Sequence, residues 1–342
     1  MKKLLNTLYV LTPDSYLFCR NENICVRIGD MEKLSVPALN IDSIVCFGKM
    51  TVSTPLLEFC GSHGISLTFI RENGRFMGRL QGPVSGNVLL RKRQYASMED
   101  AAFAQRTVQS ILLAKLRNSK LVLMRVARTE RAGAYKEELM LGVQQLNEAV
   151  ANLLECSSVD SMRGIEGAAA TSYFARFDCM LAGNPGGFRF DTRSRRPPRN
   201  EVNAALSFTY MLLSGQMQSA MEAVGLDPAA GYLHTLRPGR ASFALDLIEE
   251  LRAPLCDRFV LSLFNKGQLS RSDFDQDEEM VSLNERGHRT LLSAWEKRKQ
   301  EQIVHPFLKE KVPIGLIPYV QAMLFARVLR GDLDDYPPFV WR

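Results

Sequence analysis

The chain has 342 residues, of which 46% are hydrophobic and 23% are charged, and its formal net charge is +6. These values are ordinary for a globular protein, exclude wholesale disorder and allow two domains. No apolar run approaches the roughly 20 residues that cross a membrane, and the start lacks the cleavage site of a signal peptide. The seven scattered cysteines form no C-x-x-C pair, which argues against a structural zinc or iron–sulfur site and favours reduced thiols in the cytoplasm.

The first 81 residues are predicted to form a small β-sandwich. Short runs rich in β-forming residues alternate with turn signals such as Pro13-Asp14, and residues 41–47 and 65–70 continue the pattern. Asn73-Gly74 indicates a hairpin turn before the next strand. Thr54 followed by Pro55 indicates one short helix with Thr54 as its N-cap.

Beyond a predicted linker over 82–98 the hydrophobic period becomes helical. One apolar face is formed by Val108, Ile111, Leu112 and Leu116, and further helices are predicted at 161–181, 200–224, 242–265, 284–302 and 314–330. We therefore expect an α+β protein. Its N-terminal β-sandwich-like domain occupies 1–81, and a larger all-α C-terminal domain occupies 99–342.

Positive charge is concentrated in two segments. Residues 91–136 contain eleven Lys/Arg against three acidic residues, and residues 186–199 contain five arginines against one aspartate. Either cluster alone could be a solvated helix face. Because guanidinium groups fit phosphate oxygens, the two together favour a polyanion as partner. Asn203, Ser207 and Tyr210 follow the second cluster at helical spacing, a polar stripe that suits either solvent or a nucleic-acid backbone.

Glu166 stands in a helix where its face is otherwise small and apolar. On that helix it shares a side with Ala170, Tyr173 and Phe177. A carboxylate there is costly unless it is paired or binds a metal ion. The alternative is an exposed glutamate at the start of the helix.

Three more carboxylates and a histidine occur in "GYLHTLRPGRASFALDLIEELR" (231–252). Asp246, Glu249 and Glu250 are predicted to project from one side of a helix, and His234 lies in the loop before it. Clustered carboxylates need a compensating cation. Two interpretations remain open from these residues: a Mg²⁺ or Mn²⁺ site with one imidazole ligand, or a structural network of ion pairs with Arg240 and Arg252.

Several segments, in this order, carry a family resemblance: "RGIEGAAATSYF", "RRPPRNEVNAALSFTYMLL", "AVGLDPAAGYLH", "SFALDLIEELR", "LFNKGQL" and "LLSAWEKR". In this combination the chain resembles the CRISPR-associated spacer-acquisition integrases, and its compact loops are most similar to the subtype found with I-C type systems. The resemblance implies a homodimer with an N-terminal β-domain and a C-terminal helical domain. Two dimers would flank a dimer of a small ferredoxin-like partner in a heterohexamer, and a four-cysteine iron–sulfur nuclease would come as a separate chain.

The resemblance also implies a metal site and a reaction. The family's metal ligands match Glu166, His234 and Glu249, with Asp246 as a supporting charge and Glu250 as a less secure neighbour, an ion-pair partner. The implied activity is that of a metal-dependent DNA integrase and endonuclease. The 3′-OH of a captured duplex attacks a phosphodiester at the repeat boundary of a CRISPR array, and the same site cleaves branched DNA. Metal there would polarise the scissile phosphate and stabilise the leaving 3′-oxygen.

Charge and nearness in sequence identify candidate DNA contacts for such a reaction. They are Arg91, Lys92, Arg93, Tyr173, Arg189, Arg193, Arg195, Arg196, Arg199, Asn203, Ser207, Tyr210 and Arg240. Two other functions remain open at this point. One is a non-catalytic nucleic-acid-binding scaffold with a structural acidic and arginine network, and the other is a hydrolase of small phosphoesters.

Overall fold

The computed structural model of the chain describes residues 5–71, 76–80, 82, 88–181 and 183–341. The chain divides into two compact units, which we describe one at a time. The first comprises Met1–Ser85, Ser272–Asp275 and Ser282–Glu301, and the second comprises Gly86–Arg271, Gln276–Val281 and Gln302–Arg342. Helix α2 (Val88–Glu99) covers most of the range 82–98 that was predicted as a linker. The domain boundaries at 81 and 99 stay a prediction.

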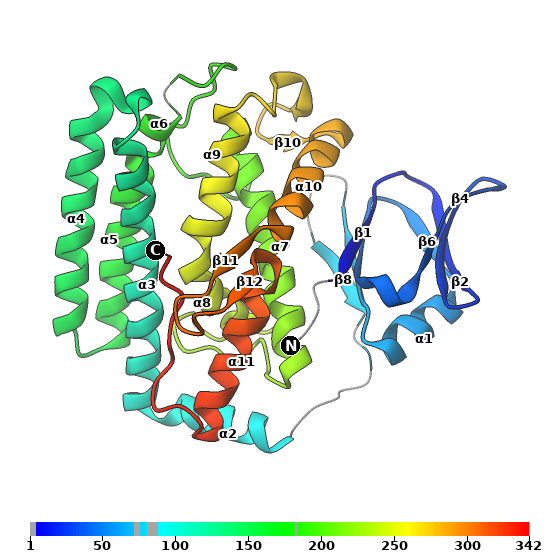
Figure 1. Cartoon of the computed structure of the whole chain (residues 1–342), viewed down its shortest axis with the longest axis horizontal. Helices are drawn as coiled ribbons and strands as arrows, with labels where there is room; N and C mark the ends of the chain where they lie inside the picture. Colours follow the sequence, from blue (N-terminus) through cyan, green and yellow to red (C-terminus); the bar gives the residue numbers. More distant parts are fainter. Residues whose placement is uncertain (1–4, 72–75, 81, 83–87, 182, 342) are drawn as a thin grey trace. The chain divides into compact units, whose positions relative to one another are not determined.

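The first unit contains two four-stranded sheets (blue in Figure 1). The first sheet has the strand order β4-β3-β2-β6, and only its β2–β6 pair is parallel. The second sheet has the order β1-β5-β7-β8, and only its β7–β8 pair is antiparallel. The strands are β1 Asn6–Val10, β2 Ser15–Arg20, β3 Asn23–Ile28, β4 Met31–Pro37, β5 Ile41–Phe47, β6 Met50–Val52, β7 Ser66–Ile70 and β8 Phe76–Leu80. The Asn73-Gly74 turn lies outside the described residues.

Both sheets contribute to one hydrophobic core, as expected for a sandwich. Leu17 and Ile24 from the first sheet and Ile44 and Leu67 from the second are fully buried in the same cluster. Alternating side chains of each strand point to opposite faces, so one face of each sheet can supply this core. The predicted β-sandwich-like character of the N-terminal part is confirmed.

Two helices complete the first unit, α1 (Thr54–His63) and α10 (Glu285–Gln300). The N-cap of α1 is Ser53 and not the predicted Thr54, because Ser53 has extended backbone and its Oγ accepts the N–H of Leu56 at 3.3 Å. Helix α10 is tied to β1, where Tyr9 donates to the Glu296 carboxylate at 2.8 Å. The unit is therefore assembled from segments far apart in the sequence.

The second unit is mostly helical. Its long helices α3 (Ala101–Ala127), α4 (Lys136–Glu155) and α5 (Val159–Ala175) run side by side (Figure 1). The others are α6 Phe177–Met180, α7 Glu201–Val224, α8 Ser242–Leu251, α9 Arg258–Asn265 and α11 Ile317–Arg330. These helices and α10 match the predicted ranges. The unit is not all-α, however, because β11 (Gln302–Val304) and β12 (Lys311–Pro313) form an antiparallel hairpin. A second short ladder is formed by β9 (Phe274–Gln276) and β10 (Val281–Leu283), most of whose residues belong to the first unit.

The range predicted as one helix over 242–265 is continuous but not uniform. Between α8 and α9 the residues Arg252–Asp257 form a π-helical turn. Pro254 lies in this turn and has no N–H to donate, so a wider turn accommodates it better than a regular α-helical one. The turn carries Arg252 and Asp257, both of which line the same hollow as Glu249.

Two broader expectations can be compared with the described part of the chain. Within it, no helix combines the length and the apolar character required of a membrane span. All seven cysteines are unpaired thiols.

Candidate metal centre

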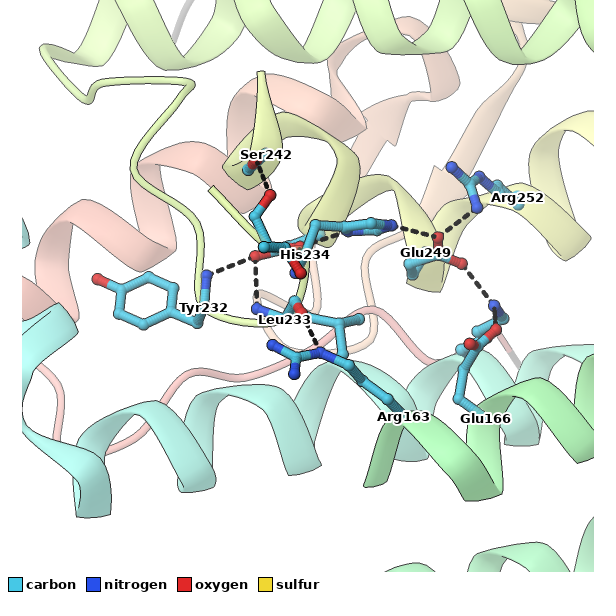
Figure 2. Close-up of polar contacts among 11 residues, drawn as sticks. Arg163, Glu166, Tyr232, Leu233, His234, Ser242, Glu249 and Arg252 are labelled. Carbon is cyan, nitrogen blue, oxygen red and sulfur yellow. Dashed lines mark hydrogen bonds and ion pairs between the residues drawn. The ribbon is translucent and has the colours of Figure 1, made fainter. Parts of the chain in front are cut away.

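Asp246 of α8 organises the loop that carries His234. Its buried carboxylate accepts the backbone N–H groups of Tyr232, Leu233 and His234 at 2.7–2.9 Å and the His234 Nδ1 at 2.6 Å (Figure 2). An ionised carboxylate can only accept, so Nδ1 bears a proton, and in the neutral imidazole this leaves the lone pair on Nε2. That Nε2 lies 3.8 Å from Oε1 of Glu249. The carboxylate thus fixes both the orientation and the tautomer of the imidazole, as it does for many metal-binding histidines.

Glu249, one turn after Asp246, lies between two cations. Its side chain is 4% exposed, and it forms ion pairs with Arg252 through Oε1 and with Lys115 through Oε2. Burial alone would raise the pKa of Glu249, but the charges of Arg252 and Lys115 outweigh burial and lower that pKa to about 2. Glu249 is therefore a carboxylate at every physiological pH.

Glu166 reaches the same place from α5. This helix begins after Ser158, so Glu166 lies two turns inside it and not at its start. Its side chain is 25% exposed, and its Oε1 is bonded to the Lys115 ammonium that also contacts Glu249. Figure 2 shows Glu166 and Glu249 approaching each other from different helices, with His234 on the far side of Glu249.

These groups suit a hard divalent cation. Two carboxylates and one imidazole are ligands that Mg²⁺ and Mn²⁺ accept. Oε2 of Glu249 is buried and makes no hydrogen bond of good geometry, although the Lys115 Nζ lies 2.6 Å away. The ammonium stands where a cation would bridge the carboxylates. Among the described residues, no three His, Cys, Asp or Glu side chains already converge closely enough to share one metal ion.

Glu250 faces away from this centre, which corrects the expectation that all three carboxylates share one side of α8. It is fully buried and accepts hydrogen bonds from Gln321 Nε2 at 2.8 Å, the Tyr336 hydroxyl at 2.7 Å and the Phe339 N–H at 3.0 Å. These three donors are neutral, and within the described ranges no cation forms an ion pair with Glu250, contrary to the expected ion-pair role. Burial raises the pKa of Glu250 to about 7. Adjacent helical residues point about 100° apart, which separates Glu250 from Glu249.

Comparison with known proteins assigns the chain to a family. The model of the family "CRISPR associated protein Cas1" matches residues 8–297. The CRISPR-associated endonuclease Cas1 1 of Chlorobaculum tepidum is 44% identical over 344 residues, covering 100% of both chains. The chain belongs to the CRISPR-associated Cas1 family. The predicted enzyme class, a CRISPR-associated DNA endonuclease and integrase of spacer acquisition, is that of this family, so the scaffold and small-phosphoester alternatives are set aside.

Solved structures show that the fold is also that of Cas1. A CAS1 protein from Thermotoga maritima superposes with a TM-score of 0.82 at 23% identity, covering 96% of this chain and 97% of that one. A chain of a complex described as Cas6-RT-Cas1–Cas2 superposes with a TM-score of 0.84 at 20% identity, covering 100% of this chain and 36% of that longer one. Their low identities support the α+β architecture alone.

Some residues predicted to contact DNA form hydrogen bonds inside the protein instead. Asn203 is fully buried, where its amide bonds the Thr192 carbonyl and its oxygen accepts from Arg193. Arg193 also donates to Ser207, so these three hold the arginine-rich segment against α7. Buried Tyr173 donates to Asp257 at 3.0 Å. Because their polar groups are used internally, Asn203 and Tyr173 do not present a donor to a DNA backbone.

Tyr210 has a double role beside the candidate metal centre. Its hydroxyl donates to Asp257, and its ring lies under the guanidinium groups of Arg193 and Arg252 at 5.4 and 5.2 Å. Burial raises the pKa of both Tyr210 and Tyr173, so each stays a neutral donor. It also raises the pKa of Asp257 to about 6. Tyr210 and Tyr173 line the hollow beside Glu249, together with Arg195.

The other candidate cations are open to solvent or partly so. Arg195, Arg196 and Arg199 are exposed, and so are Lys92 and Arg93 of α2; Arg91 and Arg240 are half-buried. Arg93 donates to the carbonyls of Leu329 and Arg330, and Arg189, exposed, pairs with Asp178 at 2.9 Å. As DNA contacts these residues stay a prediction.

Two residues of the centre escaped sequence analysis. Lys115 counted only as one charge in a basic segment, although it follows Ile111 by four and Leu112 by three and so interrupts an apolar face. That interruption was the available signal. Arg163, on the helix of Glu166, donates through Nε to the Leu233 carbonyl at 2.6 Å and so ties α5 to the His234 loop (Figure 2). No local pattern marks that contact.

Proposed function

We propose that Glu166, His234 and Glu249 hold Mg²⁺ or Mn²⁺ and that this centre joins the 3′-OH ends of captured DNA to the repeat boundary of a CRISPR array by transesterification. The observation that carries the proposal is the approach of these three side chains from α5, a loop and α8, with His234 already oriented by Asp246. The bound cation would supply charge for the scissile phosphate and the leaving 3′-oxygen.

The protein's own residues support this chemistry in distinct ways. Asp246 keeps the proton on Nδ1 of His234, so the imidazole offers a lone pair at Nε2 and is no free general base. Arg252 pairs with Glu249 and lies beside the same hollow as Arg195, a cationic lining that suits a phosphodiester. The reacting phosphate is therefore expected between the carboxylates and these guanidinium groups.

The assembly and setting are proposed along with the chemistry. We expect a homodimer that joins a small ferredoxin-like partner of the Cas2 kind in a heterohexamer acting on double-stranded and branched DNA, with a four-cysteine iron–sulfur nuclease as a separate chain. The I-C subtype is proposed on the compact loops of the sequence. Because a CRISPR array is chromosomal DNA, we expect the reaction to take place in the cytoplasm.

A half-site integration assay tests the proposal. It combines the purified chain and its small partner with a 3′-OH duplex, a repeat-containing plasmid and Mn²⁺ or Mg²⁺. Glu166→Gln is expected to abolish strand transfer and branched-DNA cleavage while binding DNA as the unchanged protein does. Unchanged strand transfer would refute the metal site. Metal-dependent turnover of free nucleotides but not of duplex DNA would contradict the proposed reaction.

The neighbouring glutamates provide a matched comparison for the third ligand. Glu249→Gln is expected to remove strand transfer and Mn²⁺ binding together, because Oε2 is the buried oxygen that faces Glu166 across Lys115. Glu250→Gln should lower thermal stability but bind Mn²⁺ normally, since Glu250 faces Gln321 and Tyr336. A loss of Mn²⁺ binding confined to Glu250→Gln would contradict the assignment.

A further inference from the structure

Lys115 occupies the space between the two carboxylates of the proposed centre. From α3 its Nζ contacts Oε1 of Glu166 and lies 2.6 Å from Oε2 of Glu249. The side chain is only 14% exposed. An ammonium in such a position is stable only with counter-charges beside it, and two carboxylates facing each other need a cation between them. The three groups therefore stabilise one another.

The other cation on Glu249 is held differently. Arg252 binds the opposite oxygen, Oε1, and its guanidinium also lies over the ring of Tyr210 at 5.2 Å. Lys115 has no such ring contact within the described part of the chain, and its charge is carried by a flexible four-carbon stem. Of the two cations, Arg252 therefore has the additional ring contact, and Lys115 is the one that we expect to be displaced more easily.

A divalent ion bound by Glu166 and Glu249 would compete with Lys115 for Oε2 of Glu249, because Arg252 already binds the other oxygen of that carboxylate. We infer that Lys115 is a displaceable counter-ion, which holds the two carboxylates together in the metal-free protein and gives up that place when a divalent cation binds. The displaced ammonium stays at the rim of the hollow that it lines with Arg195 and Tyr210, where a DNA phosphate is the natural acceptor. This inference rests on the proposed metal site.

Direct Mn²⁺ titration of the full chain without DNA tests the inference. Lys115→Met keeps an unbranched stem but removes the charge, so Mn²⁺ no longer competes with an ammonium. We expect its Mn²⁺ affinity to rise about tenfold, the equivalent of about 1.4 kcal/mol. Lys120→Met is the matched control, because Lys120 is on the same helix and bonds the neutral Asn147 at 3.0 Å; its affinity should not change.

Thermal unfolding gives a second readout that a merely structural lysine would not produce. Without metal, Lys115→Met should melt below the unchanged protein, because Glu166 and Glu249 then repel each other. With saturating Mn²⁺ the two melting temperatures should converge. Equal destabilisation with and without Mn²⁺, or Mn²⁺ affinity at or below that of the unchanged protein, would overturn the inference.

Two further variants separate the possible failures. If Glu166→Gln keeps full Mn²⁺ affinity, the metal site itself is wrong; if it loses affinity while Lys115→Met gains none, only the counter-ion role is wrong. Should Lys115→Met not fold, Lys115→Arg decides. A guanidinium can bind carboxylates through two parallel hydrogen bonds, so this variant is expected to bind Mn²⁺ about tenfold more weakly. Tighter binding by Lys115→Arg would contradict displacement.

Discussion

Replacing Asp246 by asparagine should weaken both the fold and the metal centre. The buried carboxylate accepts four hydrogen bonds, three from backbone N–H groups of the His234 loop and one from the imidazole. Asparagine has one acceptor oxygen, so its NH₂ would face two of these donors. At about 1.5–3 kcal/mol for each hydrogen bond to a charged group, losing two costs about 3–6 kcal/mol.

The same substitution should change the tautomer of His234. If the asparagine NH₂ faces Nδ1, that nitrogen must accept, and the proton moves to Nε2, on the side of Glu249. The lone pair is then lost from the metal side. We expect Mn²⁺ affinity to fall by about 10–100-fold, the usual effect of removing a residue that orients a ligand.

Urea unfolding and Mn²⁺ titration of Asp246→Asn measure the two effects. Asp332→Asn is the control, because Asp332 forms an ion pair with Arg330 that is open to solvent, and such pairs contribute about 0–1 kcal/mol. An Asp246→Asn protein that unfolds at the same urea concentration as the unchanged protein would refute the hydrogen-bond argument. Unchanged Mn²⁺ affinity would refute the argument from the tautomer.

Three further predictions concern Asp257, Gly287 and Arg163. Burial raises the pKa of Asp257 from 3.8 to about 6, so the native state binds this proton more tightly than the unfolded state and the free energy of unfolding falls as pH rises from about 4 to 6. At 1.36 kcal/mol per pKa unit, this group lowers that free energy by about 3 kcal/mol. In Asp257→Asn, stability measured by urea unfolding should therefore change less with pH over this range. A steeper profile would contradict this. In Gly287→Ala the new Cβ would lie 2.1 Å from the Asp273 carbonyl oxygen, so the melting temperature should drop sharply. Gly215→Ala is the control: apart from its chain neighbours and the nearby backbone of its own helix, no atom lies within 4 Å of the new Cβ, so its free energy of unfolding should rise by about 0.5–1 kcal/mol. Equal effects of the two variants would refute the packing argument. Arg163→Gln loses the hydrogen bond from Nε to the loop carbonyl and should lower Mn²⁺ affinity with little change in melting temperature, which the same titration checks; full affinity would show that the loop needs no tie to α5.

Much of the fold could be predicted because its signals are local. The helices over 201–224 and 317–330 follow from apolar spacing and end at Gly225 and Gly331, whose positive φ angles suit glycine. The π-helical turn at Arg252–Asp257 and the hairpin of β11 and β12 were not predicted, because each depends on local geometry or on pairings that three-residue strands hardly encode. Segments 272–275 and 282–301 belong to the first unit because they contact residues far away in the sequence. The spacing of apolar residues within a segment gives no information about such contacts.

The candidate centre divides in the same way. By itself the sequence identified Glu166, His234, Asp246, Glu249 and Glu250 as polar residues in or beside apolar patterns, because a buried charge needs a partner. The choice of Glu249 over Glu250 came from the family resemblance. Only the tertiary structure decided which residues bind to these side chains. Adjacent side chains on a helix point about 100° apart. Glu250 therefore accepts a hydrogen bond from Tyr336 of the C-terminal segment, whereas Glu249 pairs with Lys115 of α3. Such contacts depend on how the helices pack against each other, so the spacing of residues along one helix does not predict them.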